Sequence, residues 1–218
     1  GKNFAALLPA EAARALVSGG FAFELAGSEI TFTLPAGATE ALLKATDNVA
    51  WLSVAAGKVG PEHISLPEGT RVVACKLMEL ELAALTPEGA KERPGADLAE
   101  KITVTVSLEG IDPVKVSAKD LAVYRQRKGG SWEYVGGSVS SDGRNISFRT
   151  ARSGVYAILD YRQTFADVSS HWAKSDIEVM AKKLIARGVS GDSFAPDAPL
   201  TRAQFAAFLV RLLGLEEE

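Results

Sequence analysis

The sequence has only one cysteine, Cys75, among its 218 residues. No disulfide can therefore form within the chain, and a metal site built from several cysteines is excluded. The sequence also lacks an excess of either charge, because 24 Lys and Arg residues stand against 27 Asp and Glu residues, which gives a net charge of −3. Nucleic-acid binding needs a clustered basic face, and none is evident, so we expect no nucleic acid among the partners.

Long apolar runs are absent as well. A membrane-spanning helix requires about 18 consecutive apolar residues, and no stretch approaches that length, so we expect no membrane insertion. The first residues lack the basic and then apolar pattern of a secretory signal, so they predict no cellular location. Because the chain begins with Gly1 and not with Met, we expect a piece of a longer protein.

The overall composition is that of a folded protein, with 47% apolar and 23% charged residues. A domain of ordinary size has roughly 150 residues, so this length predicts one large domain or two unequal ones. A chain this long buries roughly 70% of its unfolded surface, which is enough for a real core.

The first part of the chain has the period of β-strands. Residues 102–108 alternate strictly, which places Ile102, Val104, Val106 and Leu108 on one face of a strand. Similar runs predict strands at residues 21–25, 29–34, 49–55, 71–82, 121–126, 132–135, 145–148 and 155–161. Turn residues separate these runs, so we expect a sandwich of short strands and not alternating strands and helices. Pro and Gly signals add short helices at residues 9–17 and 39–46.

The pattern becomes helical after Tyr161. From residue 170 onward, apolar residues recur at helical spacing, and Gly188 is a natural residue to follow the end of that helix. A second helix begins at Thr201, whose pairing with Gln204 fits a capping box, and its apolar face includes Phe205, Phe208 and Leu212. We therefore predict a mainly β, sandwich-like domain at residues 1–162 and a small all-α helix–loop–helix module at residues 163–218.

Short motifs follow one another in a fixed order through the helical part. They are Phe165-Ala166-Asp167-Val168, His171-Trp172-Ala173, Gly188-Val189, Phe194-Ala195-Pro196-Asp197 and Thr201-Arg202-Ala203-Gln204. Together they resemble the S-layer homology (SLH) module of bacterial surface proteins. The resemblance implies an extracellular location at the cell wall and non-covalent binding to an acidic secondary cell-wall polysaccharide, often one that bears pyruvate ketals.

The same resemblance implies which residues contact the glycan. Trp172 and Arg202 are the main candidates, and Asp167 and Gly191 are weaker ones. Three features depart from the family pattern. Gln204 stands where Glu is usual, and the connection from Gly188 to Phe194 is a residue or more shorter than usual. One module is present where members commonly carry three. The apolar face of the second helix is therefore expected to pack on the β-domain, on a second copy, or on further modules of the same chain.

Alternative roles remain open for the two main candidates. A cation in the first turn of a helix is disfavoured by a few tenths to about 1 kcal/mol, so Arg202 is better explained if an anion meets it there. A sugar carboxylate would suit its guanidinium, but Arg202 could instead pair with Asp167 or Asp197. Trp172 could stack on a sugar or could pin the two helices together.

No catalytic signature is present. The sequence has no nucleophile elbow, phosphate-binding loop, dinucleotide fingerprint or zinc-protease motif, so we expect no enzyme, no cofactor and no metal. Glu79 and Glu81 point to one side of a strand, which more simply indicates an exposed face than a pair for glycoside hydrolysis. We therefore predict a non-enzymatic surface protein anchored to the wall. The alternatives are an accessory and anchoring region of a larger extracellular polysaccharide-acting enzyme, or a module used only for protein–protein assembly.

Overall fold

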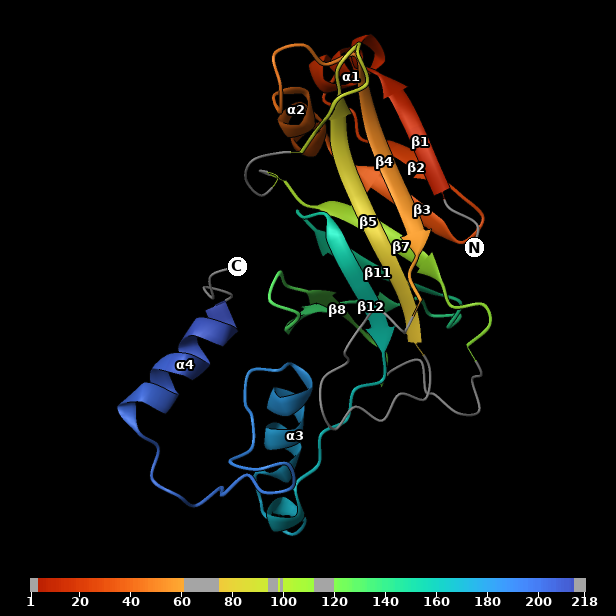
Figure 1. Cartoon of the computed structure of the whole chain (residues 1–218). Helices are drawn as coiled ribbons and strands as arrows, with labels where there is room; N and C mark the ends of the chain where they lie inside the picture. Colours follow the sequence, from red (N-terminus) through yellow and green to blue (C-terminus); the bar gives the residue numbers. More distant parts are fainter. Residues whose placement is uncertain (1–3, 61–74, 94–97, 99, 112–119, 214–218) are drawn as a thin grey trace.

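The computed structural model describes residues 4–60, 75–93, 98, 100–111 and 120–213, and it contains two antiparallel sheets (Figure 1). Sheet A has the order β1-β4-β5-β12-β8-β9, with β6 beside β5. Its strands are β1 (Phe4–Pro9), β4 (Trp51–Lys58), β5 (Cys75–Leu85), β6 (Lys91–Glu92), β8 (Ala122–Gln126), β9 (Trp132–Gly136) and β12 (Gly154–Leu159). Sheet B has the order β10-β11-β7-β3-β2, with strands β2 (Phe23–Ala26), β3 (Ile30–Leu34), β7 (Ile102–Ser107), β10 (Ser138–Val139) and β11 (Asn145–Thr150).

The two sheets share one apolar core. Strand β7 alternates buried and half-buried residues along its whole length, as its sequence predicts. Its inward side chains meet those of sheet A in a single cluster that includes Phe32 and Ile146 from sheet B and Leu80 and Ile158 from sheet A. The prediction of a mainly β, sandwich-like chain with short helices is therefore confirmed.

Three strands have no counterpart among the predicted runs. Strand β1 is rich in Ala and Leu and ends in Pro9, which favours helix or turn over strand, but pairing along its full length with β4 overrides that preference. Strands β6 and β10 have two residues each and carry no periodic signal. The predicted strand at residues 71–82 corresponds to β5, and residues 71–74 lie outside the described residues.

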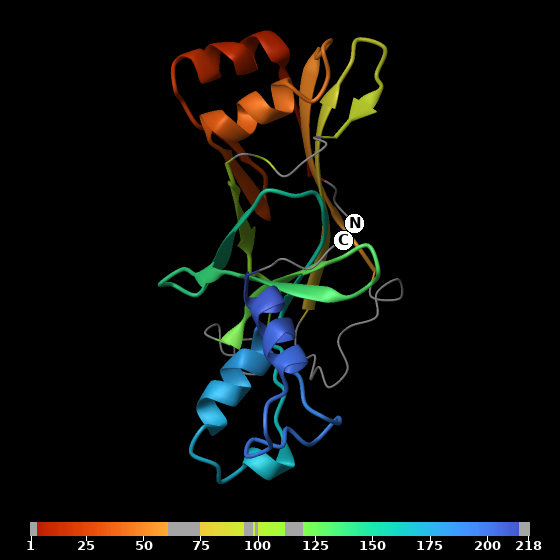
Figure 2. The ribbon, with the colours of Figure 1, turned by 90° about the vertical axis from the view of Figure 1, so that its left-hand side faces the viewer.

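Two short helices lie side by side at one end of the sandwich (Figures 1 and 2). Helix α1 (Ala10–Ser18) follows Pro9 and helix α2 (Ala36–Leu43) follows Pro35, because proline fits the start of a helix. Helix α1 ends as predicted at Gly19-Gly20, where Gly20 has a φ of 69°. Helix α2 begins earlier than the predicted residue 39, since the proline and not the following apolar spacing sets its start.

The helical part has a small core of its own. It contains a 3-10 turn, η3 (Ala166–Val168), and helices α3 (Lys174–Lys182) and α4 (Arg202–Leu213). Four buried residues form this core: Phe165, Val168, Ile177 and Ala181. Ala173 and Phe194 are half-buried and pack against it. The predicted first helix is therefore present, but it begins at Lys174 and not at residue 170.

The predicted end of that helix at Gly188 is wrong. Leu184 has a φ of 56°, and its N–H donates to the Ala181 carbonyl at 2.8 Å, while the Ile185 N–H donates to the Met180 carbonyl at 3.0 Å. This is a Schellman ending with leucine in the left-handed position that glycine usually occupies. Gly188 serves another purpose, because a Cβ there would lie 2.5 Å from the carbonyl oxygens of the nearby loop.

The end of α3 is attached to the outer face of sheet A. The hydroxyl of Tyr124 on β8 donates to the Lys182 carbonyl at 3.0 Å, and the Lys182 ammonium donates to the Asp120 carbonyl at 2.7 Å. Leu184 packs against an apolar cluster on that face that includes Tyr124, Tyr161 and Leu77. The division into residues 1–162 and 163–218 stays a prediction, and these contacts cross it.

Helix α4 differs from α3 because none of its residues is buried. It stands apart from α3 in Figure 1, and Phe205 and Leu212 are 54% and 56% exposed. The Arg211 guanidinium reaches back to the Ile185 carbonyl at 3.2 Å. The predicted face of Phe205, Phe208 and Leu212 therefore does not pack on the β-rich part, and its packing on a second copy or on further modules stays a prediction.

Candidate glycan-binding site

Asp167 fixes the loop that precedes α4. Its carboxylate accepts hydrogen bonds from the backbone N–H groups of Phe194 at 3.0 Å and Ala195 at 2.7 Å, and from the Ser193 hydroxyl at 2.8 Å. The backbone bond from Phe194, followed by that from Ala195, holds the pKa of this carboxyl below its usual range. Asp167 is therefore a loop-positioning group in this structure, as a turn or capping residue would be.

Arg202 is the first residue of α4 and is exposed to solvent. The helix start beside it is capped as predicted, because the Gln204 N–H donates to the Thr201 hydroxyl at 3.2 Å and the Gln204 side-chain oxygen accepts the Thr201 N–H at 2.9 Å. Within the described part of the chain, no carboxylate pairs with Arg202. Its expected alternative partners, Asp167 and Asp197, are both engaged elsewhere.

Trp172 lies at the surface just before α3 and is 86% exposed. Its ring does not pin the two helices together, so that alternative is wrong. The ring centroid lies 5.5 Å from that of His171 with an interplanar angle of 35°. Nearly the whole indole is therefore open to a ligand that stacks on its face.

His171 connects the start of α3 to the loop before α4. Its Nε2 lies 3.3 Å from the Asp197 carboxylate, and its Nδ1 accepts the Ala173 N–H at 3.2 Å. Because an acceptor Nδ1 leaves the proton of a neutral imidazole on Nε2, His171 donates to Asp197. This contact brings the segment that carries Trp172 against the loop that leads to Arg202, although no contact in the described residues joins those two side chains directly.

Gly191 lies at the exposed tip of the loop between residues 188 and 194. Its carbonyl accepts a hydrogen bond from the Gln163 side-chain amide at 3.0 Å, and a Cβ at this position would meet nothing within 4 Å. Gly191 is thus held at the surface next to Gln163. The sequence carries no signal for Gln163, because an isolated polar residue in a connecting segment has no pattern.

The carboxylates Glu79 and Glu81 lie together on the outer face of β5. Glu81 pairs with Lys91 at 2.6 Å and with Arg93 at 3.3 Å, and the hydrogen bond from Lys91 lowers the pKa of Glu81. A general acid for glycoside hydrolysis needs a raised pKa, so this pair fits the predicted solvated face. The described residues contain no group of three or more metal-ligating side chains and no helix long and apolar enough to cross a membrane.

The family of the helical part follows from direct comparison. Residues 164–206 match the family model of the S-layer homology domain. The chain therefore carries an S-layer homology domain, which confirms the resemblance that the sequence motifs predict. Such domains bind cell-wall polysaccharide in general and indicate anchoring at the cell surface.

Three curated proteins are similar to parts of the chain. Amylopullulanase of Thermoanaerobacterium thermosulfurigenes is 35% identical over 122 residues, which are 56% of this chain and 6% of that protein. Endo-1,4-beta-xylanase A of Thermoanaerobacterium saccharolyticum is 42% identical over 55 residues, or 25% of this chain and 5% of that protein. Exoglucanase XynX of Acetivibrio thermocellus is 34% identical over 90 residues, or 41% of this chain and 8% of that protein.

The chain thus spans less than a tenth of the length of these relatives. The amylopullulanase alignment is longer than the whole chain from residue 164 onward, so the likeness also includes part of the β-rich region. The likeness to amylopullulanase is therefore not confined to the S-layer homology domain.

Proposed function

We propose that this chain is a non-enzymatic part of an extracellular surface protein that attaches it to an acidic, pyruvylated secondary cell-wall polysaccharide. The S-layer homology domain makes the attachment, and the β-domain is a spacer or a lattice-building unit of a surface layer. One observation carries the proposal: Arg202 is exposed at the start of α4 with no carboxylate partner among the described residues.

The chemistry of the helix start suits an acidic sugar. A guanidinium can hold a ketal carboxylate through two parallel hydrogen bonds, and the first turn of a helix favours a bound anion. The exposed indole of Trp172 adds a surface on which a sugar ring can stack. Asp167 and Gly191 would act by holding the intervening loops in place, because the Asp167 carboxylate and the Gly191 carbonyl each accept bonds from the protein.

A second candidate function is that of an accessory and anchoring region in a larger extracellular polysaccharide-acting enzyme. The names of the similar proteins favour it, since all three are enzymes named for polysaccharide substrates and are far longer than this chain. Both candidates share the anchoring step and assign no catalysis to the described residues.

In either case, the exposed apolar face of α4 would pack on further modules of the same chain or on a second copy. If α4 serves only protein–protein assembly, the chain will not bind wall polysaccharide.

Binding to purified cell walls tests the proposal. We expect Arg202→Ala to weaken binding by about tenfold or more, since a charge-assisted bond is lost, and Arg202→Lys to restore part of it. Trp172→Ala should weaken binding to a similar or smaller extent. Arg187→Ala and Trp51→Ala are matched controls, because both remove an exposed side chain of the same type elsewhere.

Two further measurements test the ligand of the site and the absence of catalysis. Walls stripped of pyruvate should bind the unmodified chain as weakly as intact walls bind the Arg202→Ala variant. Unchanged binding by both variants would refute the assigned contacts. Release of reducing sugar from starch, xylan or β-glucan by the chain alone would refute its non-enzymatic role.

A further inference from the structure

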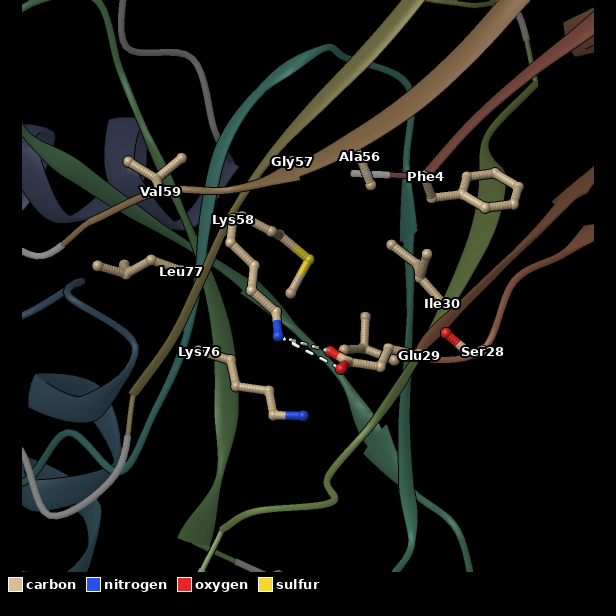
Figure 3. A pocket seen from close by; sticks show the side chains of 12 residues that line it. Phe4, Ser28, Glu29, Ile30, Ala56, Gly57, Lys58, Val59, Lys76 and Leu77 are labelled. Atoms are coloured by element: carbon tan, nitrogen blue, oxygen red, sulfur yellow. Dashed lines mark hydrogen bonds and ion pairs between the residues drawn. The ribbon is translucent and has the colours of Figure 1, made fainter. Parts of the chain in front are cut away.

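A cavity of about 530 Å³ opens between the two sheets (Figure 3). The ends of β4 and β5 that line it are those away from α1 and α2 in Figure 1. Its volume lies within the about 300–1,000 Å³ that small-molecule sites usually have. The apolar part of the wall is formed by Phe4, Ile30, Ala56, Met78 and Val106, while Val59 and Leu77 line the cavity from the side of the cluster on the outer face of sheet A. The polar lining consists of Ser28, Glu29, Lys58 and Lys76.

Both lysines occupy positions where the strand pattern calls for an apolar residue. On β4 the inward row of buried side chains at alternate residues ends at Ala56, and Lys58 is the next inward position. On β5 the corresponding row ends at Met78, and Lys76 is the next inward position. Neighbouring strands thus each end their core-facing row with an ammonium group that lines the cavity.

The two ammonium groups differ in their partners. Lys58 crosses to sheet B and forms an ion pair with Glu29 at 3.2 Å, which Figure 3 shows. Lys76 also crosses to sheet B, but its Nζ donates to the Ser107 carbonyl at 2.7 Å. No carboxylate in the described part of the chain lies within ion-pair distance of Lys76.

Lys76 therefore carries unused capacity for an anion. An ammonium has three donors, and the Ser107 carbonyl takes one of them. Burial lowers the pKa of Lys76, with a smaller lowering from Lys58, while Glu29 and Glu109 raise it. A half-buried cation is stabilised by an acceptor that carries charge, and since Glu29 already neutralises Lys58, one negative charge would complete the site.

We propose that this cavity binds an amphipathic monocarboxylate, whose carboxylate meets Lys76 and whose aliphatic or aromatic body lies against the apolar wall. A sugar fits less well, because several convergent polar groups are needed to hold its hydroxyls and the wall is mostly apolar. The proposal concerns the β-domain alone and does not depend on wall binding by the S-layer homology domain.

Calorimetry with decanoate as the probe tests this inference on the whole chain. We expect saturable binding of one decanoate per chain. The Lys76→Met variant keeps an unbranched apolar stem but loses the ammonium, and should weaken decanoate binding about tenfold or more. Decanol, which lacks the charge, should bind the chain and this variant equally. Lys128→Met, on an exposed turn, is the matched control and should bind decanoate as the unmodified chain does.

A second variant tests the location without disturbing the core. Ser28 lies on the wall and is exposed, so Ser28→Trp should fill the entrance and weaken both decanoate and decanol binding. Absence of saturable decanoate binding to the unmodified chain would overturn the proposal. Decanoate binding by Lys76→Met as tight as that of the unmodified chain would also overturn it, provided that an unfolding curve shows the variant to be folded. Wall binding by Lys76→Met should remain unchanged, which separates this outcome from failure of the anchoring role.

Discussion

The β-sandwich and the helical part of this chain differ in how completely each buries its own apolar residues. The sandwich closes one cluster with side chains from both sheets, many of them fully buried. The helical part has a cluster of four buried residues around α3, and α4 contributes none. The sandwich thus supplies its own core, whereas α4 buries no residue and has a capped start and the Arg211 bond to the Ile185 carbonyl.

Matched substitutions of a buried and an exposed phenylalanine test this difference directly. Phe32 is fully buried and stacks on Phe4 with centroids 5.7 Å apart, so Phe32→Ala should lower the free energy of unfolding by about 3–5 kcal/mol. Phe205→Ala on α4 removes the same side chain from an exposed position and should cost less than about 0.5 kcal/mol. Denaturant unfolding of both variants measures the contrast, and equal losses would show that α4 is covered in solution.

The next effect concerns the loop that Asp167 holds, because several hydrogen bonds to one carboxylate are lost together. The pKa of Asp167 is lower in the folded chain than its ordinary value of about 3.9. The stability that this carboxylate gives the loop is therefore fully present above the ordinary pKa and is lost as the pH falls through the lowered one. We expect Asp167→Asn to speed amide exchange at Phe194 and Ala195 at neutral pH and to abolish this acid dependence.

Amide exchange by NMR between pH 3 and 6, corrected for intrinsic rates, measures that change. The matched control is Asp142→Asn, whose carboxylate holds a turn of the sandwich through Ser140 and Arg144. It should loosen that turn and leave the loop before α4 unaltered. An acid dependence that persists in Asp167→Asn would contradict the assignment.

A smaller effect tests the connection between the two regions. Tyr124→Phe removes the hydroxyl that donates to the Lys182 carbonyl and should destabilise the attached end of α3 by about 0.5–1.5 kcal/mol. Hydrogen exchange in residues 174–186 reports this loss. Tyr134→Phe is the control, since the Tyr134 ring packs edge-on against Tyr124 and its hydroxyl has no partner among the described residues. Equal exchange in both variants would mean that the bond does not hold the regions together.

The smallest effect concerns two non-glycine residues with positive φ in the helical part. Ala195→Gly relieves a left-handed alanine but adds backbone freedom to the unfolded chain, so we expect a net gain of only a few tenths to about 1 kcal/mol. Leu184→Gly relieves the same strain but removes a side chain packed on sheet A, so it should destabilise. Thermal unfolding of the pair measures the difference, and a gain in both would show that the Leu184 contact contributes little.

Much of the fold is predictable because its signals are local. Alternation gives β7 its inward face, and the Thr201–Gln204 cap by itself marks the start of α4. Strand β1 was not predictable, since only its long-range pairing with β4 makes it a strand. The end of α3 differs from the predicted one because sequence rules favour glycine after a helix, whereas Leu184 takes that position and packs on a distant strand.

The candidate site likewise has features that the sequence predicts and features that it does not. The resemblance to S-layer homology modules implies Trp172, Arg202, Asp167 and Gly191, and the match over residues 164–206 confirms that resemblance. Whether Arg202 pairs with Asp167 or Asp197 could not be predicted, because the partners of those carboxylates are set by loop geometry. The role of Lys58 and Lys76 in the cavity depends on the pairing of the two sheets, although the sequence does show that each alternating apolar row ends at a lysine.

The position of β12 has a mechanical consequence for a protein tethered to a wall. The chain leaves the sandwich from β12, and residues 160–173 connect this strand to α3, the first helix of the S-layer homology domain. Because β12 lies between β5 and β8, antiparallel to both, tension from the tether enters a strand held along both edges. A pull along its axis would load two ladders of hydrogen bonds in shear at once, which makes the exit of the tether a strong point of the sheet.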